Sequence, residues 1–347
     1  MYEEITEGEA RLYVPKEKKV SKKLPVFYNP VMKLNRDITI GVLNSVGLDN
    51  MQIGLPLAGS GVRGVRLLLE LKKGKAASIE LNDMNPEAVE LIKKNLKLNH
   101  LKAGVHQKEA NEFLLQSGGF DYIDIDPFGT PNPFLDAAIK RLSRCGVLAV
   151  TATDTAGLCG TYKNVCIRNY WATPSRSEVM HESALRILIR KVQLIGAQYE
   201  RALTPVYSYA KDHYIRVFFK SKKSKRKADE LIKQHGIVLL SDGEAGPMWT
   251  GKLFDPGIAD EVARTNRFEE NIKFLNIISD ESKLNTLFFY DVHSVKKREK
   301  IDNSPRKKKL VEAIIEKGYK ASETHFCRTA IKTDMPYNEF LQLIKEF

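Results

Sequence analysis

Leu55-Pro-Leu-Ala-Gly-Ser-Gly-Val-Arg-Gly-Val-Arg66 is the segment most informative about the fold, because three glycines stand between a short apolar run and a helical one. Gly59, Gly61 and Gly64 match the pattern G-x-G-x-x-G, in which glycines allow a tight turn and a close backbone approach to a ligand. The apolar spacing of residues 65–71 predicts a helix beyond the loop. The stretch therefore predicts a strand, a ligand-binding loop and a helix, with a plain turn as the simpler alternative.

The alternation of strands and helices continues after this loop. A second apolar stretch, residues 76–81, leads to Asp83, about 20 residues past the glycines, where an acid can bind ribose hydroxyls. A short third strand leads to Glu109, and a helix over 133–142 precedes a buried strand over 146–153. Because the carboxyl ends of parallel strands share one edge of a sheet, these acids mark a ligand-binding edge.

The segment Tyr122-Ile-Asp-Ile-Asp-Pro-Phe-Gly-Thr-Pro131 runs from a buried strand into a carboxylate, a proline and an aromatic ring. Asp126 can accept an N–H bond while Phe128 offers a flat surface for stacking. This pair suits a planar base that carries an exocyclic amine. The simpler interpretation is an Asp-Pro turn that closes the strand.

Two classes of ligand fit an acid at the second strand end: a nicotinamide or flavin dinucleotide, and S-adenosylmethionine. A dinucleotide-dependent oxidoreductase explains the glycine loop but leaves Asp126 and Phe128 without a role. A methyltransferase uses both features, because a carboxylate that accepts an N–H bond stabilises the positive charge that develops on nitrogen during transfer. No strongly basic residue is needed, since the nitrogen becomes acidic once it is alkylated.

Blocks of residues that follow one another along almost the whole chain carry a family resemblance. They are Phe27-Tyr-Asn-Pro-Val-Met32, Asn35-Arg-Asp37, the glycine loop, Asn82-Asp83, Asp126-Pro-Phe-Gly-Thr-Pro131, Thr151-Ala-Thr-Asp-Thr-Ala156, Leu158-Cys-Gly160, His181-Glu182, Gly246-Pro-Met-Trp-Thr-Gly251, Tyr319-Lys-Ala-Ser322, Thr324-His-Phe326 and Ile331-Lys-Thr-Asp334. With these blocks the chain resembles the tRNA (guanine-N2)-dimethyltransferase family, which methylates guanine 26 of tRNA twice with S-adenosylmethionine. The first block and the Asp126 block are specific together, whereas the glycine loop is not.

The resemblance implies a class I S-adenosylmethionine-dependent methyltransferase, an α/β fold with a Rossmann-like, mostly parallel seven-stranded sheet, followed by a smaller α+β domain. Strands over 202–209 and 214–219 would complete the sheet with an antiparallel strand. The basic run that follows them predicts a boundary, with the catalytic domain in residues 1–220 and a basic tRNA-binding domain in residues 221–347.

The resemblance also implies roles for individual residues. Asp126 would accept a hydrogen bond from guanine N2, and Phe27, Pro127 and Phe128 would frame the base. The residues expected around the cofactor are Arg36, Gly59, Gly61, Arg63 or Arg66, Asp83, Glu109 and Ala110. Two simpler interpretations stay open, because Phe27 can be an ordinary core aromatic and Arg36 can form a surface ion pair.

Two features depart from the family pattern. Glu109 stands where the family's Asp-Ala-Asn motif has aspartate, which shifts its carboxylate by one methylene. Many relatives carry a Cys-rich zinc-binding insertion, but residues 221–247 contain no cysteine. The four cysteines of the chain form no C-x-x-C pair, so we expect no metal, and Cys159 and Cys166 are expected to be small buried residues.

Composition agrees with an enzyme that acts on nucleic acid. The 347 residues carry a formal net charge of +12, and 43% of them are hydrophobic, enough for two domains with substantial cores. Basic runs at 220–227, 296–298 and 306–309 favour tRNA as the partner, although charge alone does not separate RNA from an anionic membrane. Neither a membrane-spanning segment nor a signal peptide is recognisable, so we expect a soluble, cytoplasmic protein. A monomer is favoured, but the sequence does not settle the oligomeric state.

Three alternatives remain at this stage. An adenine-N6 or other nucleic-acid N-methyltransferase usually shows two prolines before the aromatic residue, whereas Pro127 alone precedes Phe128 here. The dinucleotide-dependent oxidoreductase is the second alternative. The third is a tRNA-binding protein without catalytic activity.

Overall fold

A seven-stranded sheet is the largest element of the structure, a computed structural model that describes residues 2–16, 26–302 and 305–347. Its strands, in sequence order, are β3 (Met51–Leu55), β4 (Ala76–Asn82), β5 (Gly104–His106), β6 (Phe120–Ile125), β7 (Leu142–Ala152), β8 (Arg201–Lys211) and β9 (Tyr214–Lys223). They lie in the order β5-β4-β3-β6-β7-β9-β8, and the five strands from β5 to β7 are parallel. Only Asp212 and His213 separate β8 from β9, so this pair is antiparallel, because parallel neighbours need a longer crossover. The predicted mostly parallel seven-stranded sheet is confirmed.

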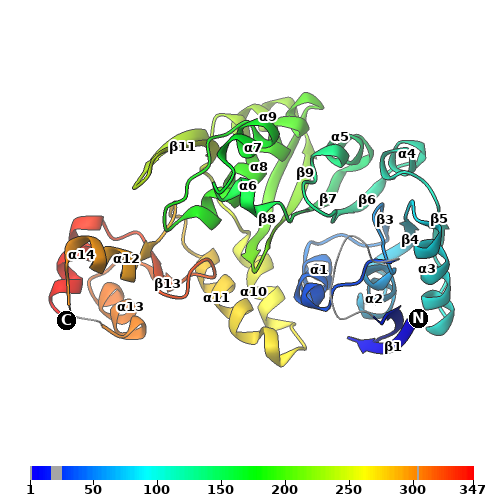
Figure 1. The fold of residues 1–347 in the computed structure, drawn as a ribbon, viewed down its shortest axis with the longest axis horizontal. Coiled ribbons are helices and arrows are strands. Elements are labelled where there is room, and N and C mark those ends of the chain that lie inside the picture. The colour runs from blue at the N-terminus through cyan, green and yellow to red at the C-terminus, as the bar shows by residue number, and fades with distance from the viewer. Residues whose placement is uncertain (1, 17–25, 303–304) are drawn as a thin grey trace. The chain divides into compact units, whose positions relative to one another are not determined.

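Helices cover both faces of this sheet. In Figure 1, α1 (Lys33–Ser45), α2 (Val62–Glu70) and α3 (Pro86–Leu98) lie on one side of the strands, and α4 (Ala110–Gln116) and α5 (Asn132–Arg141) lie on the other. The start of α3 follows from its sequence, because the Asn85 side chain accepts a hydrogen bond from the Glu87 N–H and Pro86 occupies the first turn. Strands buried on both faces need apolar side chains on both, which explains their nearly continuous apolar runs.

An N-terminal hairpin, which sequence patterns did not predict, packs against two of these helices. It consists of β1 (Tyr2–Glu7) and β2 (Ala10–Pro15), and β2 contacts α2 and α3. The Tyr13 N–H donates to Asn95 Oδ1 at 2.7 Å, and Asn95 Nδ2 donates to the Tyr13 carbonyl at 3.1 Å. The hairpin therefore uses a helix side chain to satisfy its outer edge. A short 3-10 helix, η1 (Pro30–Met32), leads into α1.

The chain forms two compact units that interleave along the sequence. The first comprises residues 1–154, 192–206 and 216–232, and the second comprises residues 155–191, 207–215 and 233–347. Both α8 (Met180–Gln198) and the β8–β9 hairpin contribute to the two units. The basic run 220–227 is no linker, since it forms the end of β9 and the start of α9 (Lys225–Ile232). A functional division near residue 220 stays a prediction.

The second unit mixes helices with small sheets. Its core includes Leu310, Ile314 and Phe340, all fully buried, beside the three-stranded sheet β12-β14-β13. The elements are α6 (Thr155–Leu158), α7 (Lys163–Tyr170), β10 (His235–Leu240), β11 (Gly243–Trp249), α10 (Pro256–Arg264), η2 (Glu269–Asn271), α11 (Ile272–Ser282), β12 (Tyr290–Asp291), α12 (Val292–Glu299), α13 (Lys307–Glu316), β13 (Ala321–Glu323), β14 (Ala330–Thr333) and α14 (Tyr337–Lys345). The predicted α+β character of the C-terminal part is confirmed.

Two predictions of local structure in this part were wrong. The spacing of 260–274 predicts one helix, but α10 ends at Arg264 and α11 begins only at Ile272. Asn266 turns the chain between them, because its side chain bonds both the N–H and the carbonyl of Phe268 in place of helical partners. The apolar run 287–292 predicts a strand, yet β12 has two residues, because the side chain of its second residue caps α12.

Candidate active site

Four parallel strands, β5, β4, β3 and β6, end side by side, and polar or glycine-rich segments follow their carboxyl ends. The glycine loop follows β3, Asp83 follows β4 and Asp126 follows β6 directly, while Glu109 lies three residues after β5. The strands are parallel and adjacent, so these segments share one edge. The predicted common edge is confirmed.

The glycine loop turns through conformations that suit glycine. Gly59 has φ of 54° and Gly61 has φ of 78°, both in the left-handed region, and Gly61 caps the start of α2. Gly64 serves packing instead, because a Cβ there would lie 2.5 Å from Leu81 Cδ2 on β4. The loop also supports Phe27, whose carbonyl accepts a hydrogen bond from the backbone N–H after Gly59 at 3.2 Å.

Asp83 is tied to the glycine loop. Its Oδ2 accepts from the Gly59 N–H at 2.8 Å, and its Oδ1 accepts from the Asn85 N–H at 3.0 Å. Burial raises the pKa of the Asp83 carboxyl, and the backbone N–H bonds act in the opposite direction. Asp83 is only partly buried, so its carboxylate can also accept from a hydroxyl of a ligand.

Glu109 caps α4 with the carboxylate that was expected near the cofactor. Its Oε2 accepts from the Asn111 N–H at 2.8 Å and from the Glu112 N–H at 3.1 Å. The side chain of Ala110 is buried, and its backbone N–H belongs to the first helical turn, which has no acceptor within the helix. The extra methylene of glutamate thus still permits capping, and the expected role of Ala110 beside the cofactor stays a prediction.

Asp126 is paired with Arg63. Arg63 Nη2 forms an ion pair with Asp126 Oδ2, and Nη1 donates to Asn35 Oδ1 and Thr39 Oγ1, each at 2.9 Å. Arg63 Nε also lies 3.4 Å from Asp124 Oδ2. The guanidinium therefore links the end of β6 to α1, and it occupies one of the two oxygens of the carboxylate that was expected to accept from guanine.

A second carboxylate near this pair, that of Asp124, is bound by Arg216, an arginine that the sequence did not identify as a site residue. Arg216 on β9 donates to both carboxylate oxygens of Asp124, at 3.0 and 2.7 Å, and to Thr151 Oγ1 at 2.7 Å. Burial acts to raise the pKa of Asp124, but Arg216 and Arg63 outweigh it and hold the pKa below its ordinary value. A lone arginine inside the apolar strand Tyr214–Lys223 was the available signal.

The structure brings Phe27 and Phe128 into contact. Their ring centroids lie 4.2 Å apart with an angle of 76° between the planes, an edge-to-face arrangement. Phe128 is 45% exposed, so a planar base can reach its ring. Pro127 joins this ring to Asp126, and the Gly129 N–H donates to Thr153 Oγ1 at 2.7 Å, which anchors the loop to the end of β7.

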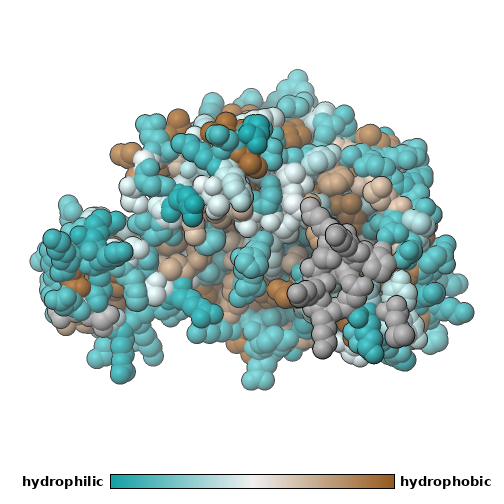
Figure 2. All heavy atoms as spheres, in the orientation of Figure 1, coloured by the Kyte–Doolittle hydropathy of each residue, from teal (hydrophilic) through white to brown (hydrophobic). Residues whose placement is uncertain are grey.

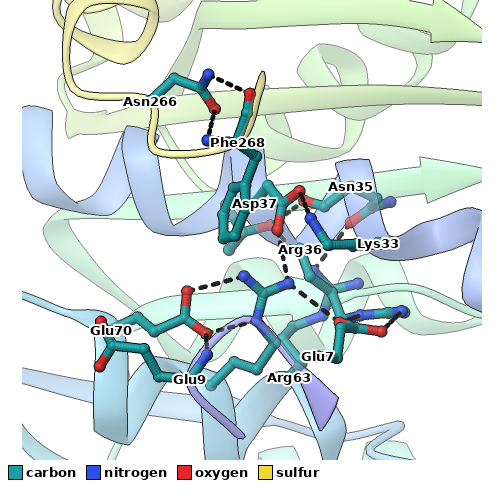
Figure 3. A network of polar contacts seen from close by, with 12 residues as sticks. Glu7, Glu9, Lys33, Asn35, Arg36, Asp37, Arg63, Glu70, Asn266 and Phe268 are labelled. Atoms are coloured by element: carbon teal, nitrogen blue, oxygen red, sulfur yellow. Dashed lines mark hydrogen bonds and ion pairs between the residues drawn. The ribbon is translucent and has the colours of Figure 1, made fainter. Parts of the chain in front are cut away.

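Arg36 and Arg66 belong to a buried network centred on Glu7 of the N-terminal hairpin. Arg36 Nε lies 2.6 Å from Glu7 Oε1, and Arg66 Nη1 lies 3.0 Å from the same oxygen. Arg66 also bonds Glu70 at 2.6 Å, and its side chain is fully buried. Figure 3 shows Glu7, Arg36 and Glu70 in this network. Glu7 was missed because acidic residues of a surface hairpin carry no distinctive pattern.

A small cavity of about 50 Å³ lies among these groups. Its lining residues are Phe27, Tyr28, Asn29, Arg36, Leu55, Leu57, Ala58, Gly59, Ser60, Val62, Arg63, Asp124 and Asp126. Arg63 borders it and Arg66 does not. Ser60 Oγ is buried and has no hydrogen-bond partner among the described residues, so it can bond a ligand.

Within residues 2–16, 26–302 and 305–347, no three histidine, cysteine, aspartate or glutamate side chains are placed to hold a metal ion. In the same residue ranges, no helix is sufficiently long and apolar to span a bilayer. The four cysteines form no disulfide, and Cys159 and Cys166 are buried as predicted. Burial raises the pKa of the Cys159 thiol to about 11, so it is a poor nucleophile. The absence of a bound metal stays a prediction.

Comparisons with known proteins agree with this arrangement. A family model described as N2,N2-dimethylguanosine tRNA methyltransferase matches residues 8–243 and 240–345. A tRNA (guanine(26)-N(2))-dimethyltransferase of Methanocaldococcus jannaschii is 37% identical over 98% of both chains. A relative from Aquifex aeolicus, named for guanine 26 and guanine 27, is 34% identical over 99% of this chain and 95% of its own. The solved structure of Trm1 from Pyrococcus horikoshii with S-adenosyl-L-methionine superposes with a TM-score of 0.88 at 35% identity and covers 98% of this chain and 99% of its own.

Proposed function

The chain belongs to the N2,N2-dimethylguanosine tRNA methyltransferase family, and on this premise we propose that it methylates guanine N2 at tRNA position 26 twice, with S-adenosylmethionine as the methyl donor. The observation that carries the proposal is the position of Asp126. It lies beside the Phe27–Phe128 pair and on the same sheet edge as the glycine loop. Family membership disfavours the adenine methyltransferase and the dinucleotide-dependent oxidoreductase.

The order of the strands supports one orientation for the cofactor. A ligand that follows the edge from β5 to β6 passes Glu109 and Ala110 first, then Asp83, then the glycine loop, and reaches Asp126 last. We assign the adenine to the Ala110 end, the ribose hydroxyls to Asp83, and the amino-acid part to the loop with Arg63 and Arg36. The unpartnered Ser60 Oγ fits a polar ligand in this path.

Asp126 would carry the chemistry on the side of the base. When bound, S-adenosylmethionine supplies a methyl group on a positively charged sulfur. The guanine amine is a poor nucleophile because its lone pair is delocalised into the ring. By accepting an N2–H bond, Asp126 favours a pyramidal nitrogen and stabilises the charge that develops on it. The proton released after alkylation passes to this carboxylate or to water, and Phe128 holds the plane of the base.

Guanine must leave its stack to reach this site, because enzymes that modify a base extrude it into a pocket. Unstacking costs a few kcal/mol, which phosphate contacts elsewhere would offset. Exposed basic side chains are available in 222–226, in 297–300 at the end of α12 and in 306–309 at the start of α13. The surface over α12 to α14 is largely hydrophilic in Figure 2.

We therefore assign methyl transfer to residues 1–220 and much of the tRNA contact to residues 221–347. A tRNA-modifying enzyme meets its substrate in the cytoplasm, and we propose that the chain acts there as a monomer. No bound metal enters this proposal.

The test is incubation of the protein with unmodified tRNA and S-adenosylmethionine, followed by nucleoside mass spectrometry and mapping of the modified position. We expect dimethylated guanosine at position 26, and the same mapping reports guanine 27. Asp126→Ala should abolish transfer while cofactor binding persists. Asp49→Ala is the control, because that side chain is 70% exposed and pairs only with Lys75 among the described residues. Full turnover by Asp126→Ala would refute the role given to this carboxylate.

A further inference from the structure

One oxygen of the Asp126 carboxylate, Oδ2, is already bound by Arg63. Building on the proposed function, we propose that Arg63 is a placeholder. The Arg63 guanidinium pairs with Asp126 and prevents Asp126 from binding guanine. This pairing lasts until the carboxylate of S-adenosylmethionine binds the guanidinium instead. The enzyme then captures guanine only after the cofactor has bound.

The two donors resemble each other chemically. Carbon 2 of guanine carries N1–H on one side and the N2 amine on the other, so this edge of the base is a cyclic guanidine. Arg63 presents the same planar set of N–H donors to Asp126, with Nη2 in the place of the guanine amine. Arg63 and guanine would therefore compete for the Asp126 carboxylate, of which Arg63 holds Oδ2. Arg63 and Asp126 both line the cavity of about 50 Å³.

The neighbours of Arg63 allow it to leave at modest cost. Asp124 keeps two bonds from Arg216, at 3.0 and 2.7 Å, whereas Arg63 Nε only approaches it at 3.4 Å. Arg63 donates its other hydrogen bonds to neutral acceptors, the side-chain oxygens of Asn35 and Thr39. Asp126 is thus the one close ionic partner that the movement of Arg63 would release among the described residues.

Arg63 is also the cation that suits the carboxylate of the cofactor. It lies in the first turn of α2, between the second and third glycines of the loop, where the helix N-terminus also favours negative charge. Arg36 is held by two bonds to Glu7, at 2.6 and 2.5 Å. A carboxylate that arrives at the loop therefore competes with Asp126 for Arg63 more readily than with Glu7 for Arg36.

Inosine provides a direct measure of Asp126 capture, because it lacks the exocyclic N2 amine. The quantity to measure is the ratio of dissociation constants for two otherwise identical tRNAs, one with inosine and one with guanine at position 26. Two cofactor analogues separate the causes. S-adenosylhomocysteine keeps the carboxylate without a transferable methyl group, whereas 5′-methylthioadenosine lacks the amino-acid part altogether.

For the wild-type protein we expect a ratio near 1 without ligand and with 5′-methylthioadenosine. With S-adenosylhomocysteine the ratio should rise to roughly 10–100, the range for a hydrogen bond to a charged group. Arg63→Met should show the high ratio without any ligand, because Asp126 is then free. Arg11→Met is the matched control, since that side chain is exposed and pairs with Glu4 at 2.8 Å.

A purely structural role for Arg63 predicts a different pattern, in which Arg63→Met lowers the melting temperature and never raises the ratio. The wild-type titrations test the proposal even if this variant does not fold. A high inosine-to-guanine ratio of dissociation constants without ligand, or equal responses to the two analogues, would refute the role of Arg63 as a placeholder. Neither result would contradict the proposed dimethylation of guanine 26. If no condition separates inosine from guanine and no methylated product forms, the proposed function itself fails.

Discussion

Arg216→Met should destabilise the protein far more than the removal of a surface arginine would, because it leaves the buried Asp124 carboxylate without its main ionic partner. Arg216 is fully buried and Asp124 is 3% exposed. Removing one partner of a buried ion pair typically costs about 3–5 kcal/mol, since the remaining carboxylate keeps its desolvation penalty. Arg63 is too distant from Asp124, at 3.4 Å, to replace two bonds. We therefore expect a loss of at least about 3 kcal/mol in the free energy of unfolding.

Urea denaturation followed by circular dichroism measures this loss. Arg226→Met is the control, because that side chain is 81% exposed and pairs with Glu230 at 3.6 Å, so its removal should change stability by less than about 1 kcal/mol. Adding Asp124→Asn to Arg216→Met should recover at least about 1 kcal/mol, because no uncompensated charge is left. A single-variant loss below about 1 kcal/mol, or no recovery in the double variant, would refute the reasoning.

Two further predictions concern charge. Replacing three exposed basic residues within 222–227 by serine should weaken tRNA binding and reduce the slope of log K against log salt by roughly one for each phosphate that the protein no longer binds. The control is the same replacement of the exposed lysines within 93–97. An unchanged slope in the first variant would exclude residues 222–227 from the interface with tRNA. Burial acts to raise the pKa of Glu281, but His325 and Lys332 lower it to about 2. The ionised Glu281 therefore contributes its full stabilisation above the ordinary carboxyl pKa, and this stabilisation is lost as the pH falls to about 2. Acid titration of Glu281→Gln should lack this component, and an unchanged acid transition would contradict it.

Much of the catalytic sheet was predictable because its signals are local. The glycine loop, the cap at Asn85 and the continuous apolar run before Asp126 each identify an element from neighbouring residues alone. Predictions weakened in the second unit, where side chains redirect the backbone. Asn266, for instance, breaks a helical pattern by bonding Phe268 on both sides. Nothing in apolar spacing reports such a bond.

Sequence by itself determined which residues end the strands, and therefore which acids line the ligand-binding edge, because parallel strands in register bring their carboxyl ends together. Tertiary structure alone decided how those residues are partnered. It put Arg63 at the cavity and Arg66 in the buried network, and it joined Arg216 to Asp124 across 92 positions of sequence. The reason is physical: strands and caps follow from interactions between near neighbours, whereas an ion pair forms wherever the folded chain brings opposite charges together out of water. The arginine on Asp126 is the clearest case, since only the folded chain shows that the predicted acceptor already has a donor.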